Sequence, residues 1–483
     1  MTANPLPENP MTTKIIATLG PASMSRESIK ALALAGASIF RLNFSHSVAA
    51  DFEPIIKIIR DVESEIGRPL TALGDLCGPK TRIGEIANAP RQVDKDEILL
   101  LGLPDEAPAS GDQAFVPLDV PGLLSGLAPG MPVNLSDGML QFTVTRTVKS
   151  DRLFEMQAHN AGMLSSRKGI AFPGKHHALP ALTEKDIKDL HEGLDIGLNA
   201  VAISFVQNAD DIRHIKGEIK KHDVWIPVVA KLERQNAVDH LDEILALTDV
   251  VMVARGDLGT ECPIAMLPII QKKIIRACRH AQKPAIVATQ MLLSMVKNPI
   301  PTRAESTDVA NAIMDGADCV MLSEETAVGD FPVEAVSYMR EISSNAVSYY
   351  LERLDGPYAP KKEKNPAKYL AYSACILADN AESRALVSHS LSGATARLLS
   401  SRRPNLPIYA LTPDERVIHH MNFVWGVTPR LIPVTDESHM KRAEHFVAQS
   451  PEFDAGESVV ITAGQPTPGQ TERFTNQIKL YFK

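Results

Sequence analysis

The chain has 483 residues, and its 44% hydrophobic and 22% charged composition is typical of a folded globular protein with about two to four domains. Its net charge of -8 excludes a general attraction to nucleic acids or anionic membrane surfaces. The five cysteines form no C-x-x-C pair, and no stretch reaches about 18 uninterrupted apolar residues. We therefore expect a cytoplasmic protein without a disulfide framework or a membrane span.

Eight short segments rich in Val, Ile, Ala and Leu recur in the first two thirds of the chain, each followed by a charged segment of helical period. They span residues 14–20, 38–45, 70–76, 200–206, 226–233, 249–257, 284–291 and 319–327. Eight buried strands that alternate with helices predict an α/β fold built on a (β/α)8 TIM barrel. An open doubly wound sheet would give the same local pattern, but the polar strand ends described below favour the barrel.

The gap between the third and fourth strands spans roughly 120 residues, far more than one crossover helix needs. Alternating segments at 132–140, 141–148 and 152–159 predict a small β-barrel domain inserted there and hinged over the barrel mouth. A Pro- and Lys-rich linker at 356–368 precedes further strand-like segments at 385–390, 406–412, 459–464 and 476–482, which predict a C-terminal α/β domain. The predicted division is a flexible tail (1–12), the barrel (13–85 and 175–350), the inserted domain (86–174) and the C-terminal domain (351–483).

Polar side chains stand at the carboxyl ends of nearly all eight predicted strands. Arg41, Asn43 and Ser45 are spaced by two, so on a strand they share one face, which in a barrel is the lumen. Two further pairs have the same spacing, namely Lys231 with Glu233 and Arg255 with Asp257. Single polar residues lie on three other predicted strands, namely Asp75, Ser204 and Thr289. If Lys231 and Glu233 were the only such pair, a structural salt bridge would explain them. So many polar strand ends instead predict an active site, because barrel enzymes assemble theirs there.

The residue types at these strand ends also indicate a ligand. The carboxylates Glu233 and Asp257 suit a hard cation such as Mg2+ or Mn2+, whereas Arg41, Lys231 and Arg82 suit a phosphorylated, carboxylated substrate. The segment LGTECP after Asp257 is a candidate helix start whose free amides would bind an anion. Asp257 could alternatively serve only as the cap of that helix. This set of residues predicts phosphoryl or enolate chemistry on a small acid.

A series of long motifs extends this interpretation. The chain contains, in order, KIIATLGPAS, RLNFSH, GDLCGPKTRIG, LPALTEKD, ISFVQNADDI, AKLERQNAVDHLDEIL, VMVARGDLG, ATQMLLSM, PTRAESTDVANA and MLSEETAVGDFPVEAV. In these motifs and their order the chain resembles the pyruvate kinase family, whose members transfer the phosphoryl group of phosphoenolpyruvate to ADP. The resemblance covers essentially the entire predicted barrel and implies the same three-part architecture.

The resemblance assigns roles residue by residue on the phosphoenolpyruvate side. Glu233 and Asp257 correspond to the divalent-metal ligands, and Lys231 to the ammonium that stabilises the phosphoryl group in flight. Arg41 and Ser204 correspond to the phosphate pocket. The backbone at Gly256 and Asp257, with Thr289, corresponds to the site of the substrate carboxylate, and Thr289 also lies where the family protonates the enolate.

On the nucleotide side the matching residues are Pro21, Asn43, His46, Arg82 and Lys168, the last reaching in from the inserted domain. Three positions depart from the common family pattern, namely Asp51, Ala171 and Glu324. They bear on the details of ADP contact rather than on the reaction. Thr302 and Glu305 have the spacing of a capping box, which predicts a structural role.

Two further features concern regulation and ions. Lys80 in GDLCGPK stands where potassium-dependent members carry Glu, beside the positions of the monovalent-cation site, Asn43, Ser45, Asp75 and Leu76. An ammonium here predicts independence from potassium, unless Lys80 only forms a surface ion pair.

A hydroxyl-rich turn precedes a helix that we expect to begin near Ala396. The turn contains Ser390, Ser392, Gly393 and Thr395. In the resembling family this loop binds a phosphorylated effector, and the enzyme is a homotetramer, which the resemblance implies here as well. The alternative is that the turn only caps the start of the helix.

Three classes of function are compatible with parts of this pattern. A Mg-dependent phosphotransferase uses every feature above. A Mg-dependent lyase or aldolase would use paired carboxylates and an Arg, but it has little use for a hinged domain bearing Lys168. A catalytically silent sensor would not need Lys231, Glu233, Asp257 and Thr289 together.

Overall fold

The computed structural model describes residues 12–79, 82–108, 114–136, 138–175, 179–361, 364–464 and 475–483. Two predictions fall partly or wholly outside these residues. They are the flexible tail, of which residues 1–11 are not described, and the placement of Lys80.

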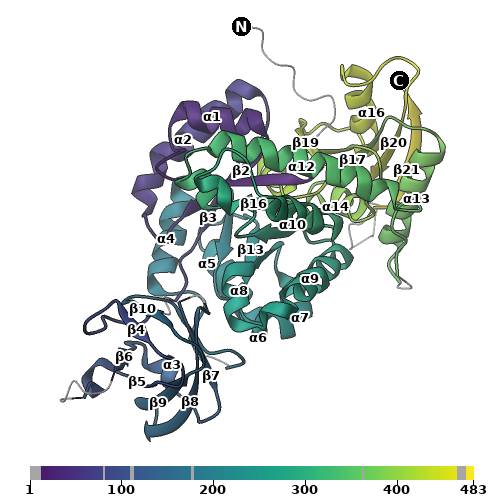
Figure 1. The fold of residues 1–483 in the computed structure, drawn as a ribbon. Coiled ribbons are helices and arrows are strands. Elements are labelled where there is room, and N and C mark those ends of the chain that lie inside the picture. The colour runs from purple at the N-terminus through teal and green to yellow at the C-terminus, as the bar shows by residue number, and fades with distance from the viewer. Residues whose placement is uncertain are drawn as a thin grey trace.

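Eight parallel strands close into a barrel at the centre of the molecule (Figure 1). In chain order they are β1 (Lys14–Thr18), β2 (Ala37–Asn43), β3 (Thr71–Asp75), β12 (Ala200–Ile203), β13 (Val228–Leu232), β14 (Val250–Ala254), β15 (Ala285–Ala288) and β16 (Cys319–Leu322). β1 pairs with both β2 and β16, so the ring has no free edge. The predicted TIM barrel is confirmed, and the open sheet is excluded.

Helices surround this barrel, and the longer ones pack an apolar face against it. They are α1 (Arg26–Ala35), α2 (Ala49–Ile66), α4 (Glu184–Asp195), α5 (Ala209–Lys220), α6 (Gln235–Asp239), α7 (Leu241–Leu247), α8 (Arg255–Glu261), α9 (Leu267–Ala281), α10 (Arg303–Met314), α11 (Glu324–Ala327) and α12 (Pro332–Glu352), with 3-10 turns at Ile264–Met266 and Leu293–Val296. In α9, Ile270, Ile274 and Cys278 recur at intervals of four and are buried against the strands. The predicted capping box is confirmed, since Thr302 Oγ1 accepts from the Glu305 amide at 3.2 Å.

Every predicted barrel strand is present, but each ends before its last predicted residues. β2 ends at Asn43, so Ser45 lies in a turn and does not share a strand face with Arg41. β14 ends at Ala254, and Arg255 and Asp257 lie in α8. The shared strand face predicted from a spacing of two was therefore wrong for these residues. Beyond the last paired residue of each strand the chain enters a turn or a helix, and a period of two no longer describes the backbone.

The inserted segment folds as a curled sheet that projects from the barrel (Figure 1). Its strands are β4 (Arg91–Val93), β5 (Ile98–Gly102), β6 (Phe115–Pro117), β7 (Pro132–Leu135), β8 (Leu140–Lys149), β9 (Leu153–Ala158), β10 (Gly162–Leu164) and β11 (Ile170–Ala171), with a 3-10 turn at Pro104–Glu106 and the short α3 (Pro121–Leu124). Six strands follow the order β11-β7-β8-β9-β5-β6, while β10 pairs with β4. A separate apolar core that includes Phe142, Phe154 and Met156 holds this sheet together.

The C-terminal segment forms a five-stranded sheet flanked by helices. It contains α13 (Pro366–Asn380), β17 (Ala385–His389), α14 (Ala394–Ser400), β18 (Ile408–Thr412), α15 (Glu415–Met421), β19 (Val427–Leu431), α16 (His439–Gln449), β20 (Ser458–Ala463) and β21 (Gln477–Phe482), and the sheet has the order β19-β18-β17-β20-β21. The sequence interpretation missed β19, which contains Pro429. A proline fits this strand because β19 lies at the sheet edge, where an amide donor can be spared.

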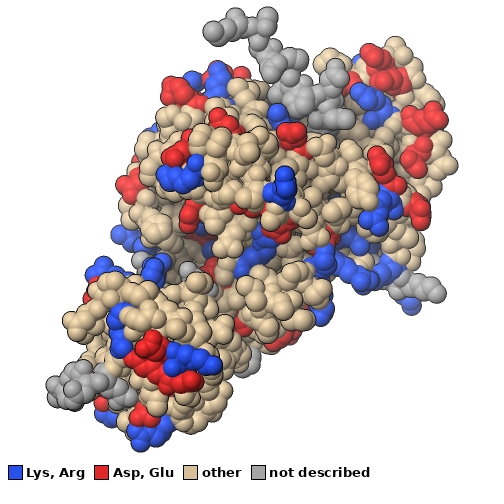
Figure 2. All heavy atoms as spheres, viewed as in Figure 1, with Lys and Arg blue, Asp and Glu red and all other residues tan. Residues whose placement is uncertain are grey.

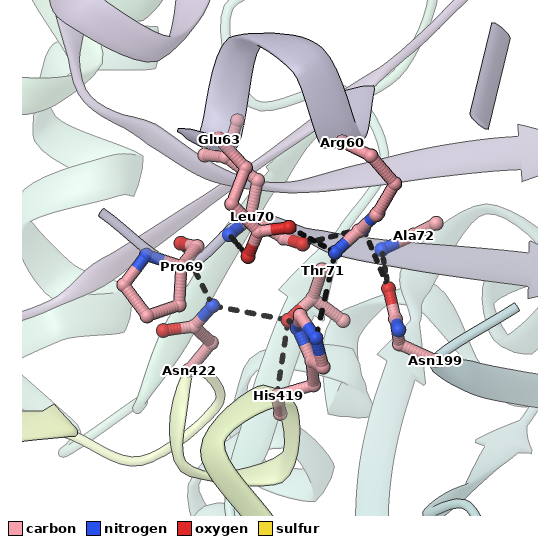
Figure 3. A network of polar contacts seen from close by, with 9 residues as sticks. All are labelled: Arg60, Glu63, Pro69, Leu70, Thr71, Ala72, Asn199, His419 and Asn422. Carbon is pink, nitrogen blue, oxygen red and sulfur yellow. Dashed lines mark hydrogen bonds and ion pairs between the residues drawn. The ribbon is translucent and has the colours of Figure 1, made fainter. Parts of the chain in front are cut away.

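A polar network joins the C-terminal segment to the barrel (Figure 3). Arg60 of α2 donates to the Leu70 carbonyl at 2.7 Å and to Asn199 Oδ1 at 2.8 Å. Thr71, the first residue of β3, donates to the His419 carbonyl at 3.1 Å and accepts from Asn422 Nδ2 at 3.0 Å. The C-terminal segment is therefore fastened to the amino-terminal end of β3, the end opposite Asp75.

Charged side chains of both signs are interspersed over the face shown in Figure 2, which agrees with the modest net charge. Across the described part of the chain, no helix combines the length and the apolar character needed to cross a membrane.

Candidate active site

A buried ammonium forms the centre of the barrel mouth. Lys231 Nζ lies 3.1 Å from Asp75 Oδ1 and 2.9 Å from Glu233 Oε1, and it donates to Ser204 Oγ at 2.7 Å. The side chains of Asp75 and Glu233 are only 1% and 2% exposed. Three strands, β3, β12 and β13, thus bring together residues that are far apart in the sequence.

Arg41 lies on the other side of Asp75. Its Nε donates to Asp75 Oδ2 at 2.6 Å, and its Nη1 donates to Thr18 Oγ1 at 3.2 Å. Asp75 therefore binds Arg41 and Lys231 with different oxygens. Because both cations bind the same carboxylate, they are held close together at the mouth. Neither the Arg41 nor the Lys231 side chain is more than 13% exposed.

The charges in this cluster shift one another's pKa values. Burial alone would raise the pKa of Asp75 and lower that of Lys231, but their mutual attraction, helped by Arg41 and Glu233, holds the Asp75 pKa below and the Lys231 pKa above the ordinary values. Glu233 behaves differently. Burial, with a contribution from the nearby Asp257 charge, raises its pKa to about 7 despite the Lys231 contact. The cluster thus contains one carboxylate that the protein alone compensates incompletely.

The Glu233 side chain is also fixed by the backbone. Its Oε2 accepts from the Phe205 amide at 2.7 Å, and Phe205 has a φ of 55°. An aromatic residue rarely adopts this left-handed conformation, which costs of order 1–3 kcal/mol. The strained turn after β12 thereby aims an amide at the carboxylate.

Thr289 and Gly256 meet beside this cluster. The Gly256 amide, in the first turn of α8, donates to Thr289 Oγ1 at 2.9 Å. Thr289 has a φ of 71°, a strained value for a β-branched residue, and Gln290 follows at 52°. The strain brings the Thr289 hydroxyl next to the start of α8.

Arg255 supports this arrangement rather than pointing into the lumen. Its Nη2 donates to the Thr289 carbonyl at 2.7 Å, while its Nη1 binds both oxygens of Asp308 at 2.9 and 2.7 Å. The expected pairing of Arg255 with Asp257 on one strand face was therefore wrong. The capping interpretation of Asp257 was also wrong, because α8 begins at Arg255 with Ala254 at its N-cap and Asp257 already inside the helix.

The inserted sheet touches the barrel directly at the mouth. Asn134 Nδ2 of β7 donates to the Thr260 carbonyl of α8 at 2.7 Å. A cavity of about 60 Å3 lies between the two parts. Its lining includes Ile170 and Phe172 from the inserted sheet, and Glu233, Arg234 and Asp257 from the barrel.

Comparison with known proteins gives the family. A sequence model described as "Pyruvate kinase, barrel domain" matches residues 11–336, and one described as "Pyruvate kinase, alpha/beta domain" matches residues 368–481. The chain is 40% identical to "Pyruvate kinase" of Agrobacterium vitis over 464 residues, covering 95% of this chain and 96% of that protein. It is 38% identical to "Pyruvate kinase" of Methylorubrum extorquens, with 97% of both chains covered, and 40% identical to "Pyruvate kinase 2" of a Synechocystis strain, with 98% of this chain and 79% of the relative covered.

The chain belongs to the pyruvate kinase family. It is accordingly a phosphotransferase, as expected from the sequence. The coverage includes the barrel, the inserted sheet and the C-terminal sheet, so the family relationship applies to the molecule as a whole.

The residues matched to the nucleotide side lie around the rim. His46 and Pro21 are exposed in turns, and Asn43 ends β2, where its Oδ1 accepts from the Ser45 amide at 3.1 Å. Arg82 and Lys168 lie next to each other across the junction with the inserted sheet. The Arg82 guanidinium donates to the Arg167 carbonyl at 3.4 Å, and the Ile83 amide donates to the Lys168 carbonyl at 2.9 Å.

The three departures from the pyruvate kinase pattern have different local settings. Asp51 lies in the first turn of α2, where its carboxylate accepts from the Val48 amide at 3.1 Å, so it stabilises a helix start. Ala171 ends β11 and lines the cavity under the inserted sheet. Glu324 is the exposed first residue of α11.

Several of the oxygens matched to the monovalent-cation site already have hydrogen-bond or ion-pair partners. Both Asp75 oxygens face cations, as described above, and the Leu76 carbonyl accepts from Ser204 Oγ at 2.7 Å. The Asn43 side chain binds the Ser45 amide. Lys80, on which the prediction depends, lies outside the described residues.

The hydroxyl-rich turn in the C-terminal part differs from its expected form. α14 begins at Ala394, two residues before the predicted start, and its N-cap is Gly393, with a φ of 70° and no side-chain cap. Ser390 and Ser392 precede it, with the Ser392 amide donating to Ser390 Oγ at 3.4 Å. Thr395 is buried and bonded to Thr475 at 2.9 Å, so its hydroxyl has a structural partner.

Three groups at the site were not predicted from the sequence. Thr18 ends β1 in the same apolar-to-polar pattern as the other strands, so that pattern could have identified it. Asp308 on α10 carries no such signal, since only the fold brings it to Arg255. The Phe205 amide is a backbone group whose role depends on a positive φ, which an aromatic residue does not suggest.

Proposed function

We propose that this enzyme transfers the phosphoryl group of phosphoenolpyruvate to ADP, giving pyruvate and ATP, in the cytoplasm. The observation that carries the proposal is the Lys231 ammonium held between Asp75 and Glu233, with Arg41 beside it. Fixed positive charge in a mostly buried site stabilises the charge that spreads over a phosphoryl group during transfer.

A divalent cation fits the carboxylates of the mouth. Glu233 is 2% exposed, and burial raises its pKa although Lys231 contacts it, so additional positive charge would favour its ionised form. A hard cation such as Mg2+ or Mn2+ prefers carboxylate oxygens and would supply that charge. Glu233 and Asp257 would hold it. When bound, the ion supplies Lewis-acid neutralisation of phosphate and enolate oxygens.

The protein's own groups divide the remaining work. Arg41 and Ser204 bind the transferring phosphate, and Lys231 stabilises it between donor and acceptor. The start of α8 at Gly256 and Asp257, with the Thr289 hydroxyl, binds the substrate carboxylate. After transfer the enolate gains a proton at its methylene carbon, and Thr289 belongs to the hydroxyl or water relay that delivers it.

The inserted domain acts as a lid over the nucleotide. Pro21, Asn43, His46 and Arg82 form the barrel side of that site, and Lys168 contributes from the inserted domain. Closure excludes water, which would otherwise accept the phosphoryl group. The contact between Asn134 and Thr260 and the cavity beneath the lid support a working interface there.

The enzyme requires no potassium. Lys80 replaces the carboxylate that potassium-dependent relatives carry, and three of the matched oxygens, Asp75 Oδ2, the Leu76 carbonyl and Asn43 Oδ1, already accept hydrogen bonds. A potassium ion would face both Arg41 and Lys231 nearby.

The C-terminal domain binds a phosphorylated-metabolite activator at Ser390, Ser392, Gly393 and Thr395, in a homotetramer. The exposed Ser392, with the partly exposed Ser390, is the supporting feature, whereas Gly393 and Thr395 are buried and shape the start of α14.

A single assay tests the reaction against the lyase and the silent sensor. Purified enzyme is supplied with phosphoenolpyruvate, ADP and Mg2+, and ATP and pyruvate are measured separately. Equal amounts of both products are expected. Pyruvate with free phosphate and no ATP, or no product at all, would refute the proposal.

A further inference from the structure

Two histidines on the outside of the barrel face each other (Figure 1 shows α4 and α5, which position them). His191 lies on α4, and His222 lies in the turn that follows α5. His191 Nδ1 and His222 Nε2 are in direct contact, and the ring centroids are 4.6 Å apart with 30° between the ring planes. The side chains are 27% and 25% exposed, so the pair lies at the surface.

A carboxylate lies beside the outer nitrogen of each ring. His191 Nε2 lies 3.0 Å from Glu218 Oε2, and His222 Nδ1 lies 3.6 Å from Asp195 Oδ1. A carboxylate at one imidazole nitrogen holds the proton there and leaves the other nitrogen with its lone pair. Glu218 lies at hydrogen-bond distance from His191 Nε2, whereas Asp195, at 3.6 Å, attracts a proton to His222 Nδ1 through its charge alone. When both outer nitrogens carry the protons, two lone pairs face each other. That arrangement is unfavourable unless a cation or a proton lies between them.

We propose that His191 and His222 form a binding site for a divalent transition-metal ion such as Zn2+, separate from the catalytic carboxylates. Imidazole nitrogens prefer Zn2+, Ni2+ and Cu2+, whereas Mg2+ prefers oxygen. Glu218 and Asp195 orient the two rings. Lys221 Nζ lies 2.7 Å from both oxygens of Glu218, so this carboxylate serves as an orienting group rather than as a ligand.

The protein supplies two nitrogens, and water completes the coordination shell. Over the described ranges, no three His, Cys, Asp or Glu side chains are grouped as a ready-made metal site. The facing nitrogens must separate to admit an ion. His222 can provide that movement because it lies in a turn rather than within α5. The bound ion would link α4 to the end of α5.

Zn2+ binding to the intact enzyme, measured by calorimetry, tests this site. An excess of Mg2+ is present throughout so that the catalytic carboxylates are occupied. Wild type, His191→Ala, His222→Ala and the control His445→Ala are compared. His445 is a matched control, because it is an exposed histidine with a carboxylate, Glu437, at 3.0 Å and a similar setting on a helix.

We expect one Zn2+ per chain in wild type and His445→Ala, with affinity at least tenfold weaker in each of the other two variants. Circular dichroism and unchanged turnover without Zn2+ verify that these variants fold. Electron paramagnetic resonance with Cu2+ should show two coupled nitrogens in wild type and fewer in either variant. Binding that survives both substitutions, or that depends on only one of the two histidines, would overturn the proposal.

Discussion

Buried charges at the two ends of the same barrel have different surroundings. At the amino-terminal end, Arg60 is bonded to the Leu70 carbonyl and Asn199, and the buried Asp318 is paired with Arg403 at 3.1 Å. At the mouth, Glu233 retains a raised pKa although it touches Lys231. Burial also raises the pKa of Asp318 although Arg403 contacts it, so a raised pKa does not by itself separate the two ends. Their positions do: Arg60 and Asp318 bond segments of the chain to one another, whereas Glu233 and Asp257 line the cavity at the mouth, where a ligand can reach them.

The largest expected effect is at the mouth. Lys231→Ala removes the ammonium that faces the transferring phosphate, and we expect kcat to fall by about 100- to 1,000-fold or more. The variant should stay folded and bind phosphoenolpyruvate. Turnover near the wild-type level would show that Lys231 belongs with the structural charges instead.

The raised Glu233 pKa predicts a pH-dependent metal affinity. A divalent ion binds the carboxylate form, so below about pH 7 the ion must displace a proton. We expect the apparent Mg2+ affinity to rise roughly 30-fold from pH 5.5 to 8.5 and to level off above the pKa. The apparent affinity is measured at each pH by titrating Mg2+ and following activity and binding heat. An affinity that does not change with pH would contradict the assignment of Glu233 as a metal ligand.

At the opposite end, Arg60→Ala should affect stability and not chemistry. It removes the ion pair with Glu63 and the hydrogen bonds to the Leu70 carbonyl and Asn199 Oδ1, which costs about 1–3 kcal/mol. The kcat should stay within about twofold. Arg26→Ala, which removes an exposed pair with Glu65, is the control and should leave the free energy of unfolding nearly unchanged. Chemical unfolding gives the free energy of unfolding of both variants, and steady-state kinetics gives their kcat. A large loss of kcat in Arg60→Ala would contradict a purely structural role.

Much of the difference between the two ends was predictable from sequence. The apolar runs indicate the eight strands, and the polar residues that follow them predicted that Asp75, Ser204, Lys231 and Glu233 would meet at one end. Arg255 could not be placed, because a period of two applies only while the strand continues and β14 ends one residue earlier. The Phe205 amide and the strained Thr289 depend on positive φ values that neither residue type favours. β19 was missed because Pro429 argues against a strand unless the edge position is known.

The smallest expected effect is that of potassium. With tetramethylammonium as the only monovalent cation, we expect full activity, and KCl at matched ionic strength should change it by less than about twofold. Lys80→Glu should create a potassium requirement, because the added carboxylate removes the fixed charge. Many-fold activation of the wild type by KCl would refute potassium independence.

The central claim is that the Glu233 charge at the mouth is fully compensated only when a metal ion is bound. Thermal unfolding with and without Mg2+ tests this claim most directly. Because the folded pKa of Glu233 is raised, the stability contribution of this group is present below about pH 4.5 and is lost as the pH rises through about 7. At pH 8 we predict that Mg2+ raises the unfolding midpoint of wild type and leaves that of Glu233→Gln unchanged, while the variant without metal is at least as stable as wild type. An equal Mg2+ effect on both proteins, or a variant that is markedly less stable without metal, would contradict the claim.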